Sequence, residues 1–91
     1  MKKIIKEKKI GKVTHYFGNI KVAVIKFSEP VSVGDSIRIE GGIDTNFKMK
    51  IVSIGLKGEK VLKCKKGQEV GIKVKNKVRE GYKVYNIINN K

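Results

Sequence analysis

The segment Val33-Gly34-Asp35-Ser36-Ile37-Arg38-Ile39-Glu40 decides the fold of this chain of 91 residues. Its first three residues are typical of a turn, and the five that follow alternate strictly between polar and apolar side chains. A period of two indicates a half-buried β-strand. The pattern therefore predicts that Ile37 and Ile39 face a core and that Arg38 faces outward.

The same alternation recurs on both sides of this segment. Toward the N-terminus it predicts strands over 10–17 and 20–27, with a tight turn at Gly18-Asn19 and a break at 28–30, where Pro30 cannot donate to a central ladder. Toward the C-terminus it predicts strands over 47–56, 61–64, 70–75 and 82–88, with a charged hairpin tip at 57–60. The further side chains predicted to face the core are Phe47, Met49, Ile51, Val70, Ile72 and Val74.

This spacing of strands and turns predicts an all-β fold. About six or seven short strands at regular intervals favour a small sandwich or a closed barrel, and closure is preferred because it removes exposed edges. The length supports one domain. We expect the barrel over 10–88, a basic, flexible or partly ordered N-terminal segment over 1–9, and a C-terminal tail over 89–91.

The charge is high. The chain has 22 lysines and arginines against 8 acidic residues, a net charge of +14, whereas a magnitude of about 2–8 keeps a small domain soluble. A polyanion is the partner class that this excess favours. The alternative is a lysine-rich, heat-adapted proteome, because Arg38 and Arg79 are the only arginines.

Catalytic, metal and membrane functions find little support. His15 and Cys64 are the only histidine and cysteine, and about four such ligands make a structural zinc site. His15 is expected to be an ordinary strand residue rather than a base, and Cys64 a small buried hydrophobe rather than a thiolate activated by neighbouring lysines. No nucleotide-binding loop, signal peptide or apolar stretch of about 20 residues is present. The expectation is a cytoplasmic protein without cofactor, metal or membrane span.

Lysines and tyrosines form the remaining signal. The candidate nucleic-acid-binding residues are Arg38, Lys48, Lys50, Lys57, Lys60, Lys63, Lys65, Lys66, Lys73, Lys75 and Arg79. Lysine suits phosphate contact better than base reading, so binding is expected to be directed at the nucleic-acid backbone. Tyr16, Tyr82 and Tyr85 either offer stacking faces to unpaired bases or pack in the barrel.

Several segments, taken in order, resemble a known family. They are 10–13, 33–39, 52–54, 66–72 and 78–85, and Val33-Gly34-Asp35 is the strongest among them. Together they resemble the second domain of translational GTPases such as elongation factor Tu, and they are similar to the C-terminal barrel of collagenase-like peptidases. The resemblance implies a six-stranded Greek-key barrel whose relatives contact transfer RNA or the ribosome. The GTPase domain of that family has no counterpart in this chain.

The sequence thus predicts a non-catalytic domain that acts by binding. The leading hypothesis is an RNA-binding domain, for transfer or ribosomal RNA, that uses a lysine-lined surface. The alternative is a protein-interaction module that docks onto an enzyme or a translation partner, with the lysines only solvating it. Lysines gathered on one face favour the first hypothesis, and lysines spread evenly favour the second.

Overall fold

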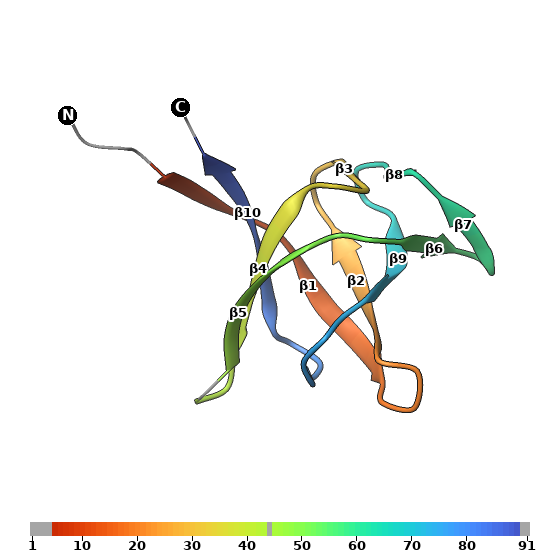
Figure 1. Ribbon diagram of the computed structural model, residues 1–91, viewed down its shortest axis with the longest axis horizontal. Helices are drawn as coiled ribbons and strands as arrows, with labels where there is room; N and C mark the ends of the chain where they lie inside the picture. The colour runs from red at the N-terminus through yellow and green to blue at the C-terminus, as the bar shows by residue number, and fades with distance from the viewer. Residues whose placement is uncertain (1–4, 44, 90–91) are drawn as a thin grey trace.

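The computed structural model describes residues 5–43 and 45–89, and all regular structure in these ranges is β-strand (Figure 1). The strands are β1 (Ile5–Phe17), β2 (Val22–Phe27), β3 (Val31–Ser32), β4 (Ser36–Gly41), β5 (Thr45–Lys50), β6 (Ile54–Leu56), β7 (Glu59–Val61), β8 (Lys63–Cys64), β9 (Glu69–Lys73) and β10 (Lys83–Asn89). The predicted all-β class is confirmed. Residues 1–4 of the expected N-terminal segment and residues 90–91 of the expected tail lie outside the described residues.

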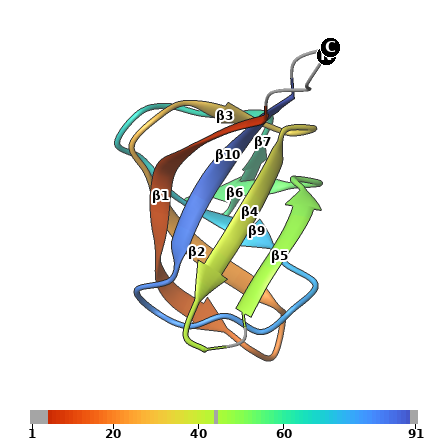
Figure 2. The same cartoon turned by 90° about the vertical axis from the view of Figure 1, so that its left-hand side faces the viewer.

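Eight of the strands form one antiparallel sheet in the order β5-β4-β10-β1-β2-β9-β6-β7, and β3 pairs with β8 in a second sheet. The large sheet is strongly curved. Figure 2 shows β5, β4, β10 and β1 in front of β9, β6 and β7, so that the two halves of the sheet face each other. The hydrophobic core lies between these halves.

The predicted closed barrel is not found in the described ranges, where no ladder joins the end strands β5 and β7. The strand predicted over 47–56 is interrupted at Ile51. The N–H of Ile51 donates to the carbonyl oxygen of Asp35 at 2.8 Å, and the carbonyl oxygen of Ile51 accepts from the N–H of Gly34 at 2.8 Å. The backbone of Ile51 is therefore hydrogen-bonded to the turn at 33–35 and does not pair with a neighbouring strand. Breaks such as this one explain why the structure has more strands than predicted.

β1 is the longest strand and joins the two halves of the sheet. Its first part pairs with β10 and its last part with β2. The register shifts between Lys9 and Gly11 and again between Val13 and His15, and such bulges bend a strand and increase its twist. At Gly11 the two strands come so close that a Cβ would lie 2.7 Å from the carbonyl oxygen of Lys26. Glycine is therefore needed at this bend.

The two predicted hairpin tips differ in outcome. Between β6 and β7, Lys57 and Gly58 have φ of 52° and 84°, the positive pair of a two-residue hairpin turn; a hairpin tip is therefore present within the predicted 57–60, but Glu59 and Lys60 belong to β7. Between β1 and β2 the predicted tight turn at Gly18-Asn19 is wrong. The turn spans 18–21, and the left-handed backbone falls on Lys21, with φ of 55°.

The core is made of aliphatic side chains from both halves of the sheet. The predicted core residues Ile37, Ile39, Ile51, Val70, Ile72 and Val74 are buried, whereas Phe47 and Met49 are half-buried against the core. The latter two belong to β5, an edge strand with a neighbour on one side only. No buried polar or charged residue occurs among the described side chains. Polar and charged side chains are therefore left to form the surface.

Candidate binding surface

Three of the predicted binding residues meet on the outer face of β4 and β5. Arg38 lies directly opposite Lys48, and Lys50 lies opposite Ser36. The Arg38 guanidinium sits 4.5 Å from the centre of the Tyr85 ring of β10. Arg38 also donates to the Glu40 carboxylate at 3.1 Å and to the Asn46 side-chain oxygen at 3.0 Å.

The other predicted residues are distributed over several turns. Lys57 and Lys60 belong to the β6–β7 hairpin, which lies on the opposite side of the molecule from β4 and β5 in Figure 1. Lys63 is in β8, and Lys65 and Lys66 follow it. Lys73 ends β9, while Lys75 and Arg79 lie in the connection to β10. The structure therefore does not gather the predicted set onto one surface.

A second group of lysines, missed at the sequence level, forms a continuous row. Lys83 of β10, Lys12 of β1 and Lys26 of β2 are direct cross-strand partners, and all three are exposed. We call these three residues the lysine row. Neighbouring strands are about 4.8 Å apart, so their side chains leave the sheet next to one another.

A hollow of about 520 Å³ borders the lysine row, and we call it the lysine hollow. It is lined by Lys9, Gly11, Lys12, Lys26, Phe27, Ser28, Lys66 and Gly67. Four of these residues are lysines, and none is acidic. Only Lys66 belongs to the set predicted from the sequence.

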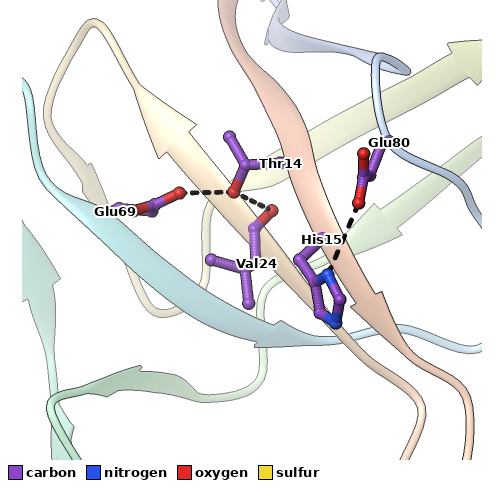
Figure 3. Close-up of polar contacts among 5 residues, drawn as sticks. All are labelled: Thr14, His15, Val24, Glu69 and Glu80. Atoms are coloured by element: carbon purple, nitrogen blue, oxygen red, sulfur yellow. Dashed lines mark hydrogen bonds and ion pairs between the residues drawn. The ribbon is translucent and has the colours of Figure 1, made fainter.

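The two acidic residues at the ends of the lysine row are engaged elsewhere. Glu40 lies opposite Lys83, but its carboxylate accepts from Arg38. Glu69 lies opposite Lys26, but its carboxylate accepts a short hydrogen bond from the Thr14 hydroxyl (Figure 3). Among the described side chains, no carboxylate lies within 4.0 Å of an ammonium group of the lysine row. The ammonium groups of the row therefore form no contact ion pair among the described side chains.

His15 lies beside a carboxylate on the surface. Its Nδ1 is 3.5 Å from Glu80 Oε2 (Figure 3), and the two side chains are 51% and 70% exposed. The ring packs edge-on against Phe17, with the centroids 4.3 Å apart. The hollow beside His15 is lined by Tyr16, Lys77, Val78, Arg79 and Glu80, and it contains no serine, threonine or cysteine. The lining therefore offers His15 no serine, threonine or cysteine to activate as a base.

Cys64 is buried, as predicted. Its side chain is 1% exposed, and the thiol donates to the carbonyl oxygen of Lys65 at 3.4 Å. Burial raises the pKa of the Cys64 thiol, which is the opposite of activation by nearby lysines. Residues 5–43 and 45–89 also contain no group of three or more histidine, cysteine, aspartate and glutamate side chains placed to hold a metal ion. Likewise, these ranges contain no helix long and apolar enough to cross a membrane.

The three tyrosines all have partners within the fold. Tyr16 and Tyr82 pack against the core, and Tyr85 is covered by Arg38. An ideal Cβ on Gly41 would lie 2.2 Å from the Tyr82 ring, so this ring rests directly on the backbone of β4. These environments agree with the expectation that the tyrosines pack within the fold, and not with the alternative that they offer stacking faces to unpaired bases.

Comparison with known proteins relates the chain to peptidase domains. It is 33% identical over 76 residues to an uncharacterized protease of Methanocaldococcus jannaschii, a match that covers 84% of this chain and 19% of that protein. The chain thus spans about a fifth of the length of this curated relative. No protein-family model matches the chain.

Two crystal structures of the C-terminal domain of a putative U32 peptidase from Geobacillus thermoleovorans have the same fold. Each gives a TM-score of 0.79 at 22% identity over 85% of this chain, and the match covers 96% of one structure and 89% of the other. The expected similarity to the C-terminal domain of collagenase-like peptidases agrees with this fold. The relation to the second domain of elongation factor Tu stays a prediction.

Proposed function

We propose that this chain is a non-catalytic binding domain that docks onto a protein partner, and that the partner is a peptidase of the U32 type. The observation that carries the proposal is the match to a segment amounting to 19% of a protease. A solved counterpart is itself a C-terminal domain of a putative peptidase, matched over 96% of its length. Because the matched segment is only about a fifth of the protease, a binding role fits it better than cleavage of a peptide bond.

The side-chain chemistry of the described residues supports a binding role. A nucleophile needs an adjacent base and an orienting group. The Cys64 thiol is buried with a raised pKa, and the hollow beside His15 is lined by no serine, threonine or cysteine. The row and hollow of lysines, in contrast, offer a surface for recognition.

Two measurements test the proposal. The purified chain is assayed alone for hydrolysis of fluorescent casein, and it is mixed with a U32-type peptidase of the same organism for size-exclusion chromatography with light scattering. We expect no hydrolysis by the chain alone and a complex that elutes ahead of either protein. Hydrolysis that disappears in the His15→Ala or Cys64→Ala variant would overturn the non-catalytic role. The lack of a complex at about 100 µM of each protein, enough to populate weak complexes, would overturn the partner.

RNA binding is the second candidate function. The net charge of +14 supports it, as does the cross-strand series of Lys48, Arg38, Tyr85 and Lys9 on β5, β4, β10 and β1. This hypothesis predicts that the affinity for transfer RNA falls steeply between about 50 and 200 mM salt, because bound phosphates release counterions. A flat response in fluorescence anisotropy would refute it.

The domain boundaries, the fold family and the cellular location are part of the same proposal. We place the domain over 10–88 and relate its curved sheet to the Greek-key barrel of translational GTPases, on the strength of Val33-Gly34-Asp35 and the strand that follows. A cytoplasmic location is supported by the single buried cysteine, because small secreted domains rely on disulfides.

A further inference from the structure

The lysine row carries an electrostatic cost that the fold itself does not relieve. Lys12 lies directly opposite Lys83 on one side and Lys26 on the other. Like charges directly opposite each other on neighbouring strands are destabilising. The acidic residues at the two ends of the row are held by Arg38 and Thr14. An anion from outside the described part of the chain would relieve this repulsion.

The lysine hollow provides space for such an anion. Lys9 and Lys12 come from β1, Lys26 from β2, and Lys66 from the turn after β8, so three separate segments direct lysines to one place. The bulge between Lys9 and Gly11 lies in its lining. A bulge re-aims side chains and is common next to functional sites. The backbone conformation, and not only the number of lysines, therefore brings these lysines together.

The chemistry of the hollow favours carboxylates over the unpaired bases of a single-stranded nucleic acid. Single-stranded nucleic acids are bound by a basic groove together with aromatic side chains on which bases stack. The aromatic residue in the lining is Phe27, which is 0% exposed, so its ring offers no stacking face. Lysine, a compact point charge with three donors, serves separate carboxylates well.

We propose that the lysine row and the lysine hollow together form a docking site for an acidic segment of the partner protein. The charge complementarity of four lysines without an acidic neighbour in the lining carries this assignment. The inference rests on the proposed function and names the chemistry of its partner. A segment crossing β10, β1 and β2 would present carboxylates to Lys83, Lys12 and Lys26.

The test uses labelled hexaglutamate as the acidic probe, with hexaglutamine and hexauridylate as comparisons. Fluorescence anisotropy at about 0.1 M salt, where the Debye length is about 10 Å, measures each probe against the wild-type chain and two double variants. Lys12→Glu with Lys26→Glu changes the site. The matched control, Lys57→Glu with Lys75→Glu, makes the same change in net charge on two exposed turns.

We expect hexaglutamate to bind the wild type and to lose at least about tenfold in affinity in the site variant, equivalent to about 1.4 kcal/mol. The control should lose about threefold or less, because exposed charges beyond a Debye length are screened. Equal losses in both variants, or no binding of hexaglutamate, would overturn the site. Tighter binding of hexauridylate that is lost in the site variant would overturn the carboxylate assignment in favour of nucleic acid.

Two further measurements separate this inference from the proposed function. The neutral variant Lys12→Gln with Lys26→Gln should melt at the same temperature as the wild type or higher, since it removes like-charge repulsion, and should still lose hexaglutamate binding. A peptidase complex that forms equally well with the wild type and the site variant would leave the proposed function standing and refute the acidic docking site. Hexaglutamate binding without a peptidase complex would refute the proposed function and leave the carboxylate-binding site standing.

Discussion

Replacement of Gly41 by alanine tests how the end of β4 is packed. An ideal Cβ at this position would lie 2.2 Å from Cδ1 and 2.3 Å from Cγ of Tyr82. Rotation of the ring about its own axis cannot relieve the contact with Cγ, because χ1 fixes the position of that atom. The Tyr82 side chain would have to leave its place against the core, so Gly41→Ala should destabilise the domain.

The size of the effect follows from two opposing contributions. Overpacking of this kind costs about 1–3 kcal/mol, and alanine is favoured over glycine within a strand by about 0.5–1 kcal/mol. The net loss should be about 1–2 kcal/mol in the free energy of unfolding. For a domain of this size, each kcal/mol lowers the melting temperature by about 4–8 °C.

Urea unfolding followed by circular dichroism measures this loss, and a double-mutant cycle identifies its cause. In the Tyr82→Ala background the obstructing ring is absent, so Gly41→Ala should become neutral or stabilising by up to about 1 kcal/mol. Gly55→Ala in β6 is the matched control, since its Cβ would meet nothing closer than the Gly71 carbonyl oxygen at 3.9 Å. An equal loss from Gly41→Ala in both backgrounds would refute the reasoning.

Three further predictions concern single residues. Gly11→Ala should destabilise the domain by about 2 kcal/mol or more, because its Cβ would press against the backbone oxygen of Lys26 rather than a side chain that can move; a change below about 0.5 kcal/mol in urea unfolding would contradict this. Cys64 should resist Ellman's reagent until the protein unfolds. Since burial raises the pKa of its thiol, the unfolded state loses that proton first, and stability should fall with rising pH above the ordinary thiol pKa; a Cys64→Val variant with the same decline at alkaline pH would show another cause. His15→Ala should change stability by no more than about 0.5 kcal/mol, because the pair with Glu80 is exposed; a larger loss on thermal unfolding would disprove this.

The strands and the core could be predicted because they depend on local alternation. Ile37, Ile39, Val70, Ile72 and Val74 are all buried, as the period of two indicated. The breaks within the predicted strands could not be predicted in the same way. Ile51 keeps its apolar side chain in the core while its backbone bonds to Gly34 and Asp35, residues far away in the sequence. Side-chain pattern and backbone pairing are separate properties, and the sequence pattern reports the first.

The candidate site was harder to predict because it depends on register. A two-residue turn at Gly18-Asn19 would have paired Lys12 with Ile25, an inward-facing residue. The longer turn at 18–21 and the bulges of β1 instead place Lys12 opposite Lys26. A shift by one residue moves a side chain to the other face of the sheet. The alternation did indicate that both lysines face outward, but the meeting of the two was not visible in the sequence.

A lysine-rich proteome explains the number of lysines in the chain. It does not explain the placement of the acidic residues opposite the lysine row. Glu40 and Glu69 lie opposite the two end lysines of the row, but neither carboxylate contacts these lysines. Both carboxylates turn instead to Arg38 and Thr14. Like charges directly opposite each other are destabilising, and exchange of Lys12 to glutamine would remove both like-charge pairs of the row. An arrangement so easily relieved by one substitution, next to a bulge and a hollow, is better explained by an acidic partner than by composition alone.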